Sequence, residues 1–231
     1  MATGAAMNDP ATIRRLYGRR QGHKLRDGQA ALAQDMLPRV AVPDGPLDAV
    51  ALFGSERPLE LEIGFGGGEH LAAQAAARPG TGFIGCEPFL NGVVQALGHL
   101  RDGALSNVRL HMGDALDVLE RLPDASLSRV YLLHPDPWPK ARHAKRRMAN
   151  HGPLDLIAAK LQPGAEFRLG TDDPTYCRWA LMVMGQRTDF RWTAGRAADF
   201  LERPADWPET RYERKARRHG HEVWYFRYVR V

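Results

Sequence analysis

The stretch that decides the fold is LELEIGFGGGEHL, from Leu59 to Leu71. A short run rich in apolar residues is followed at once by a turn with glycine at positions 64, 66, 67 and 68, and a helix-like segment opens at Glu69. Glycine permits a tight turn and lets the backbone approach a ligand closely. The stretch therefore predicts a buried strand, a ligand-binding turn and a helix.

Similar apolar runs recur along the chain, from the start of this stretch onward. They occupy residues 58–63, 81–86, 107–112, 128–133 and 165–170. Helix-like segments rich in Ala and Leu, such as 69–77 and 90–100, lie between several of them, and a last run of β-branched and aromatic residues fills 221–231. Strands that alternate with helices predict an α/β fold, in which a mostly parallel sheet is covered by helices on both faces.

Three carboxylates occur at the ends of successive predicted strands. Glu62 precedes the glycines, Glu87 follows the second run, and Asp114 follows the third. Ligands of such sheets bind at the carboxyl ends of the strands, so we expect these acids at one edge. Each acid alone is better explained as a helix cap or a solvated charge. Together with the glycine turn, the three acids predict a binding site.

The glycine turn also distinguishes between candidate cofactors. The nicotinamide fingerprint, G-x-G-x-x-G/A, would start at Gly64 and needs Gly or Ala at position 69, where this chain has Glu69. The pattern E-x-G-x-G-x-G, from Glu62 to Gly68, instead resembles motif I of the class I S-adenosylmethionine methyltransferases. This resemblance implies a Rossmann-like fold with a seven-stranded sheet, and an acidic pocket for a cofactor that carries a sulfonium and an amino group.

A proline-rich segment, PDPWPKARHAKRR, follows the fourth predicted strand and runs from Pro135 to Arg147. Its three prolines fix three backbone angles and would hold Asp136 and Trp138 in one arrangement. Alone, the segment fits equally well a turn with a solvated acid, and its basic run fits a solvated helix face. At the ligand-binding edge of the sheet, however, we expect the acid to face a substrate and the basic run to contact RNA phosphates.

The same string is similar to the signature of the bacterial tRNA (guanine-N7)-methyltransferases, which methylate the guanine at position 46 in the variable loop of tRNA. Five other segments support the resemblance in the family's order: LEIGFGGG, GCEP, GDALDVL, GTDDPTY and TRYERKARRHG. The match extends from about Leu59 to the end of the chain. It implies S-adenosylmethionine as the cofactor and tRNA as the partner.

Carried onto the matching positions, the resemblance implies three sets of site residues. The cofactor-binding set is Glu62, Gly64, Gly66, Gly68, Glu87, Asp114 and Asp136. Asp136 would also be the catalytic residue. The set that contacts the substrate nucleotide is Lys140, Asp172, Thr210, Arg211, Tyr212 and Glu213. The set on the RNA backbone is Arg142, His143, Lys145, Arg146 and Arg147.

Two positions depart from the family pattern. His134 stands where an aromatic residue is expected before the PDPW string, and Asp173 follows Asp172 where an aromatic or polar residue is commoner. Neither position belongs to the set of acids above. Both departures bear on how the target base packs, so the positions 171–173 are less sharply defined than 136–147.

Other functions fit parts of the sequence. An RNA methyltransferase that acts on amino groups places Asp or Asn before Pro-Pro-aromatic, and here the segment 136–138 lacks the second proline. A non-catalytic RNA-binding protein would explain the basic run but not the glycine turn with its acids. A cytosine-C5 methyltransferase needs a nucleophilic cysteine near the donor, and the positions of Cys86 and Cys177 do not suit that role.

Length and composition give the remaining expectations. The 231 residues, 44% of them hydrophobic, suit one methyltransferase domain at 46–231 after a basic, partly ordered arm at 1–45. A formal charge of +5 with clustered basic residues favours a polyanionic partner. Two isolated cysteines and the lack of an apolar signal or spanning segment predict a cytoplasmic protein without a metal site. The oligomeric state stays open, with a monomer favoured.

Overall fold

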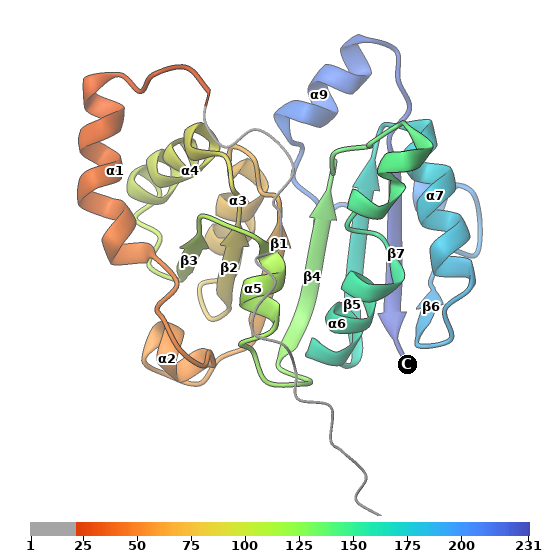
Figure 1. Ribbon diagram of the computed structural model, residues 1–231, viewed down its shortest axis with the longest axis horizontal. Coiled ribbons are helices and arrows are strands. Elements are labelled where there is room, and N and C mark those ends of the chain that lie inside the picture. Colours follow the sequence, from red (N-terminus) through yellow and green to blue (C-terminus); the bar gives the residue numbers. More distant parts are fainter. Residues whose placement is uncertain (1–21) are drawn as a thin grey trace, which may run out of the picture.

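The computed structural model describes residues 22–231, so expectations about the first part of the N-terminal arm lie outside the described residues. A seven-stranded sheet in the order β3-β2-β1-β4-β5-β7-β6 forms the centre of the molecule, and helices cover both of its faces (Figure 1). The strands are β1 Leu59–Ile63, β2 Gly82–Cys86, β3 Val108–His111, β4 Leu127–Leu133, β5 Leu161–Thr171, β6 Phe190–Trp192 and β7 Trp224–Arg230.

The pairing of the strands confirms the predicted α/β fold with a mostly parallel sheet. Strands β1 to β5 pair in parallel, and β7 runs antiparallel to both β5 and β6. The chain moves outward from β1 through β2 to β3 and then returns to the other side of β1 for β4. This reversal leaves a crevice beside the carboxyl ends of β1 and β4, where ligands of such sheets bind.

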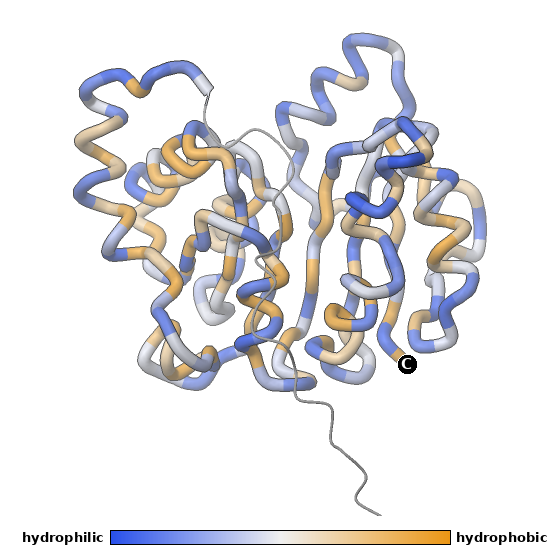
Figure 2. Tube along the Cα trace, viewed as in Figure 1, coloured by the Kyte–Doolittle hydropathy of each residue, from blue (hydrophilic) through white to orange (hydrophobic). Residues whose placement is uncertain are grey.

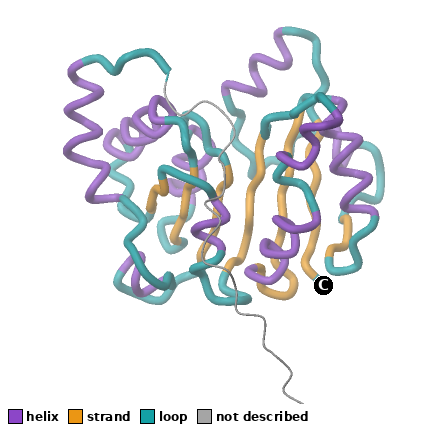
Figure 3. The backbone as a smooth tube through the Cα atoms, in the orientation of Figure 1, coloured by secondary structure: helices purple, strands orange, loops and turns teal. Residues whose placement is uncertain are grey.

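The helices are distributed around the sheet, as Figure 3 shows in purple. They are α1 Asp27–Val40, α2 Ala49–Phe53, α3 Glu69–Ala77, α4 Leu90–Asp102, α5 Ala115–Leu119, α6 His151–Lys160, α7 Pro174–Gly185, α8 Ala198–Leu201 and α9 Arg211–Arg218, with a 3-10 helix, η1, at Ala141–Arg146. None of the helices within the described part of the chain is long and apolar enough to span a membrane.

The core forms because successive strand residues point to opposite faces of the sheet. On β4, Leu132 joins the large cluster under α5, α6 and α7, whereas Tyr131 and Leu133 join a smaller cluster with Trp207 and Ala216 on the other face. All five residues of β1 are buried. Figure 2 shows the resulting pattern, with hydrophobic residues concentrated in the strands and along the inner sides of the helices.

Helix α1 and strand β6 are among the elements that the sequence did not predict. Helix α1 lies within the segment expected to be a partly ordered arm, and its side chains at Leu32, Met36 and Leu37 pack on the cluster beneath α3 and α4. Strand β6 has three residues, two of them exposed, so it carries no alternating apolar pattern. The division of the chain at residue 45 stays a prediction.

Candidate active site

A cavity of about 430 Å³ opens at the carboxyl ends of the first four strands. The turns that line it are Gly64 and Gly66 after β1, 86–89 at the end of β2, 113–115 after β3, and 132–136 with Trp138 at and after β4. Arg146, Met148 and Tyr212 complete its outer part. The crevice that the strand order predicts is therefore a real cavity, and its walls come from segments far apart in the sequence.

The glycine turn brings main chain to this cavity because its geometry excludes side chains. Gly68 has φ +81° and forms the N-cap of α3, and a Cβ added there would lie 2.5 Å from the Cβ of Ala96 in α4. Gly66 has φ +57°, and a Cβ there would lie 3.0 Å from the ring of Tyr212. These are left-handed conformations that residues with a side chain adopt only at a cost. The turn is thus wedged between α4 and α9.

Glu87 is fixed by backbone hydrogen bonds at the wall of the cavity. Its Oε2 accepts from the N–H of Gly66 at 2.9 Å, and its Oε1 accepts from the N–H of Phe89 at 2.9 Å. Burial raises the pKa of Glu87, and the two backbone donors oppose that shift. A carboxylate has about four acceptor sites, so each oxygen can still accept from a ligand.

Asp114 lines the same cavity and also caps a helix. Its Oδ1 accepts from the N–H of Leu116 at 3.0 Å, which makes it the N-cap of α5. Asp114 can therefore be both a helix cap and a binding residue, because one oxygen accepts the capping hydrogen bond while the residue lines the cavity.

Glu62 lies behind the cavity and is not one of its lining residues. Its buried carboxylate accepts from Nδ1 of His70 at 2.7 Å, and His70 is in turn 3.2 Å from the amide nitrogen of Gln74. Because that amide nitrogen can only donate, His70 carries its proton on Nδ1. Direct contact of Glu62 with a cofactor stays a prediction, and sequence reasoning missed the two α3 residues that hold it.

Asp136 differs from these acids because it is exposed. It lines the cavity, and its carboxylate has no hydrogen-bond or ion-pair partner among residues 22–231. The loop around it is held in an unusual shape, with φ +47° at His134 and φ +42° at Trp138. Non-glycine residues in this region cost free energy and persist only where the surroundings enforce them.

Arg147 provides that enforcement, a role that the sequence did not indicate, and its contact with RNA stays a prediction. Its side chain is buried, donating from Nε to the carbonyl of Pro137 and from Nη2 to the carbonyl of Trp138, both at 2.9 Å. The guanidinium also lies over the ring of Trp179, 4.7 Å from its centroid. These contacts hold the main chain of the loop at Pro137 and Trp138, so Arg147 stabilises the loop.

The other basic residues of this segment are either exposed or packed against Trp138. Lys140, Arg142 and Lys145 are exposed around η1, whereas Arg146 lies over the ring of Trp138 at 4.9 Å and lines the cavity. His143 meets the same ring edge-on, with centroids 5.8 Å apart. The basic run therefore forms a short 3-10 turn beside the cavity, not the face of a long helix.

Both departures from the family pattern have a structural role. His134 donates from Nδ1 to Oδ1 of Asp172 at 3.0 Å and stacks on Tyr212, with centroids 6.3 Å apart and planes at 21°. This hydrogen bond lowers the pKa of Asp172. Asp173 is the N-cap of α7, because its Oδ1 accepts from the N–H groups of residues 175 and 176 at 2.8 Å.

The four residues expected to form one substrate-contacting strip are placed differently from one another. Tyr212 lines the cavity, and the neighbouring Arg211 donates to Oε1 of Gln95 at 2.7 Å. Thr210 is the buried N-cap of α9, with its hydroxyl accepting from the N–H of Glu213 at 3.2 Å. The Glu213 carboxylate is fully buried. Only the first two are placed to meet a nucleotide in this conformation.

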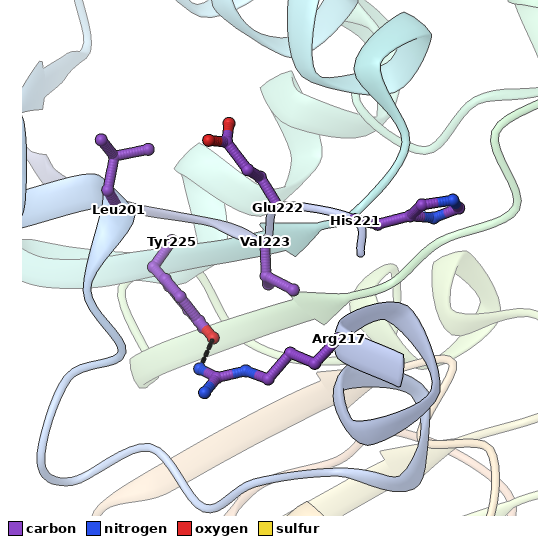
Figure 4. Close-up of a pocket in the computed structure, with 6 residues that line it drawn as sticks. All are labelled: Leu201, Arg217, His221, Glu222, Val223 and Tyr225. Atoms are coloured by element: carbon purple, nitrogen blue, oxygen red, sulfur yellow. Dashed lines mark hydrogen bonds between the residues drawn. The ribbon is translucent and has the colours of Figure 1, made fainter. Parts of the chain in front are cut away.

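Glu213 is held from the far side of α9, where a second cavity of about 310 Å³ lies (Figure 4). One of its oxygens accepts from the hydroxyl of Tyr225 and from Nη2 of Arg217 at 3.0 Å. Arg203 lies 3.3 Å from the same oxygen. These contacts anchor α9 to β7, so Glu213 positions the helix that carries Tyr212.

Comparison with known proteins places this site in a family. The profile of a family described as "Putative methyltransferase" matches residues 56–226. A protein of Zymomonas mobilis named tRNA (guanine-N(7)-)-methyltransferase is 63% identical over 230 residues, covering 99% of this chain and 100% of the relative. The chain belongs to the tRNA (guanine-N7-)-methyltransferase family. A Novosphingobium aromaticivorans protein of the same name is 60% identical, with 99% of each chain covered.

Solved structures outside this family share the fold of the methyltransferase domain. An rRNA methylase from Streptococcus thermophilus superposes with a TM-score of 0.51 at 14% identity, covering 91% of this chain and 99% of the other. TrmN from Thermus thermophilus gives a TM-score of 0.52 at 18% identity over 79% of this chain and 47% of the other. At this identity the likeness shows the fold alone, and it confirms the expected Rossmann-like class I architecture.

Proposed function

We propose that this protein transfers a methyl group from S-adenosylmethionine to N7 of the guanine at position 46 of tRNA. The observation that carries the proposal is the composition of one cavity. Its inner wall has a glycine turn and the buried Glu87, and its outer part has Asp136, which has no partner among residues 22–231, beside exposed basic residues. Membership of the tRNA (guanine-N7-)-methyltransferase family supports the substrate and the atom.

The residues of the inner wall fit the methyl donor. Glu87 would accept hydrogen bonds from the ribose hydroxyls, Asp114 from the adenine amino group, and the turn from Gly64 to Gly68 would let the backbone approach closely. Glu62, behind the turn, would add negative charge near the amino and sulfonium groups. When bound, S-adenosylmethionine supplies a methyl group on a positively charged sulfur. An acidic wall matches that positive charge, and the cofactor has no phosphate that the acids would repel.

The outer part of the cavity would position the guanine. N7 of guanine carries a free lone pair, so no residue has to remove a proton from it. Positive charge develops on the base as the methyl group arrives, and Asp136 would stabilise that charge and accept hydrogen bonds from the base. Tyr212 and Trp138 line the same space, where their aromatic rings would contact a base. Catalysis would thus depend on placement and charge.

The basic residues around η1 would hold the RNA backbone. Lys140, Arg142 and Lys145 are exposed at the rim, where they can neutralise phosphates without reading sequence. Lys140 directly follows the proline-locked loop, so it would act nearest the target nucleotide. Arg146 would contribute from its position over Trp138, between the cavity and the solvent.

A rival chemistry with a covalent cysteine intermediate is disfavoured by the state of Cys86. This residue lines the cavity, which the sequence did not reveal. Burial raises the pKa of its thiol, and the neighbouring acids Asp114 and Asp117 raise it further. The thiolate is the nucleophile in such reactions, so a cysteine held as a thiol does not suit attack on cytosine C5.

The test is to incubate unmodified tRNA with the protein and S-adenosylmethionine labelled in its methyl group, and then to map the labelled nucleotide and atom. We expect the label as 7-methylguanine at position 46. A transcript with adenine at position 46 serves as the control and should take up no label. Label on an exocyclic amino group, on cytosine C5 or at another position would refute the proposal, and so would the absence of transfer.

A further inference from the structure

Helix α9 carries basic residues on one face. We call this set the α9 stripe: Arg211, Arg214, Lys215 and Arg218. Their spacing of i, i+3, i+4 and i+7 places them on one side of the helix. The opposite side carries the buried Glu213 and Ala216, and Arg217 turns from the stripe toward Tyr225 (Figure 4). One side of α9 therefore packs against the rest of the protein, and the other side presents cations to the solvent.

The charge of the α9 stripe is only partly neutralised by the protein. Arg214 has Glu209 at 3.9 Å and Arg211 has Glu69 at 3.7 Å, both at the long end of ion-pair distances. Lys215 and Arg218 are exposed and have no acidic partner among residues 22–231. Exposed cations without partners keep their hydration and remain available to an anionic ligand.

The α9 stripe begins at the cavity and leads away from it. Tyr212 lines the cavity, and Arg211, the first residue of the stripe, directly precedes it in α9. From Arg211 to Arg218 the helix rises about 10 Å, the length of about three phosphates along one strand. In Figure 1, α9 and the loop after β4 project from the same end of the sheet, and Figure 2 shows α9 as mainly hydrophilic.

Basic residues thus stand at two separate places around one cavity. One group, around η1, comes from the loop after β4, whose Trp138 and Arg146 line the cavity. The other is the α9 stripe, which lies on the helix that contributes Tyr212 to the cavity wall. A single basic wall would hold an RNA strand on one side of the target nucleotide only. Two groups can hold the strand before and after the nucleotide that enters the cavity.

We infer that the α9 stripe is a second RNA backbone-binding surface, which holds the strand on the side of the target nucleotide opposite to the residues around η1. The inference rests on the proposed function, because it takes the cavity to receive a nucleotide of a continuous RNA strand. Its partner is the phosphate backbone, so it contributes affinity and register and no base specificity.

The experiment measures the Kd of unmodified tRNA between 50 and 200 mM salt for the wild type and for Lys215→Gln/Arg218→Gln. Two lost phosphate contacts should lower the slope of log Kd against log salt by about 1.4–1.8, so that the rise in Kd across this range is about tenfold smaller than for the wild type. Both changes are on exposed side chains, and an unchanged Tm will show that the fold is intact.

The matched control is Arg101→Gln/Arg191→Gln, which removes the same charge elsewhere. Arg101 lies in the last turn of α4, a helix that starts beside the cavity and leads away from it. Arg191 pairs with Val229 on β7. Val229 is five residues from Trp224, which pairs with the carboxyl end of β5, so Arg191 lies away from that end of the sheet. The control should keep the wild-type slope. An unchanged slope in the α9 variant, or an equal fall in the control, overturns the inference.

Methyl transfer by the wild type is assayed in parallel, since it separates the two proposals. If the wild type transfers no methyl group to guanine 46 while the slope falls in the α9 variant, the surface stands and the proposed function fails. If transfer occurs at guanine 46 and the slope does not change, the function stands and the α9 surface fails.

Discussion

The two sides of the cavity are built in contrasting ways. On the glycine side, formed by the turns after β1, β2 and β3, the acids that line it are partly or fully buried, and backbone N–H groups hold Glu87 and Asp114 in place. On the basic side, formed by the loop 134–147 and α9, the main chain is held while Asp136 and several cations stay exposed.

The difference matches the two kinds of ligand proposed for these sides. A small cofactor gains affinity from a rigid site whose dipoles are already oriented, because little ordering remains to be done on binding. A polyanion is attracted by hydrated cations over a larger surface, and that attraction is screened by salt. Changes on the glycine side should therefore alter stability and cofactor binding, and changes on the basic side should alter turnover and salt dependence.

The largest effect should come from Asp136→Asn on the basic side. The change keeps the shape of the side chain and removes the charge that would stabilise the methylated base, so methyl transfer should slow by about 10²–10³-fold. Asp136 has no partner among the described residues, so the Tm should not fall. Single-turnover kinetics will measure the step, and Asp44→Asn, an exposed acid outside the cavity, is the control. Transfer within a few-fold of the wild type would remove the catalytic role.

Next in size is Gly68→Ala on the glycine side. A left-handed backbone and a Cβ placed 2.5 Å from Ala96 should together cost about 2–4 kcal/mol in the free energy of unfolding and weaken cofactor binding. The control is Gly98→Ala on α4, where nothing lies within 4 Å of the added Cβ. That change should stabilise the helix by up to about 1 kcal/mol. Equal effects in urea unfolding would contradict the packing described for the glycine turn.

Arg147→Met separates the residue that holds the basic loop from those that would meet RNA. Loss of the hydrogen bonds to Pro137 and Trp138 should destabilise the protein by about 1.5–3 kcal/mol, while the salt slope of tRNA binding stays that of the wild type. Arg142→Met should show the reverse, with unchanged stability and a slope lower by about 0.7–0.9. A lower salt slope of tRNA binding for Arg147→Met would show that Arg147 contacts RNA.

The smallest effect should come from His134→Phe. The hydrogen bond from His134 lowers the pKa of Asp172, so the bond stabilises the fold above the unfolded Asp pKa of about 3.9, and the benefit is lost as pH falls through the lower folded value. The variant should be less stable than the wild type by under about 1 kcal/mol at pH 7, with a smaller difference once the pH falls below about 3.9.

His134→Asn is the matched control for this pair. Asparagine tolerates the left-handed backbone and can donate from its amide to Asp172, so it should retain most of the stability at pH 7. Urea unfolding at pH 7 and at pH 3 measures the effect. A difference between the wild type and His134→Phe that is the same at pH 3 and pH 7 would show that stacking on Tyr212, not the hydrogen bond, carries the contribution.

Much of the glycine side could be predicted from the sequence because its signals are local. The glycines, the strand before them and the helix after them form one continuous stretch, and the acids of the cavity wall follow short apolar runs that are easy to identify. Helix α1 could not be predicted in this way. Its apolar residues contact a cluster formed by α3 and α4, so its helical state depends on packing against distant residues.

From the sequence, the residues of the basic side could be placed at the carboxyl edge of the sheet, but their individual roles could not be derived. Arg142 and Arg147 look alike in the string PDPWPKARHAKRR, yet one is exposed and the other is buried beneath the loop. In the same way, Thr210 and Tyr212 are neighbours in one motif, but only Tyr212 lines the cavity. In η1 and α9, adjacent side chains point to different sides of the helix, and a sequence motif does not show which side each one faces.

The sequence by itself determined the α/β sheet, the edge at which its acids meet and the proline-locked loop, because each follows from local backbone preferences and from the alternation of strands and helices. Only the tertiary structure decided which charged groups have partners inside the protein and which face solvent. That decision depends on contacts across the chain, such as Glu62 with His70 and Arg147 with Trp179, where burial is tolerated because each charged group finds a partner.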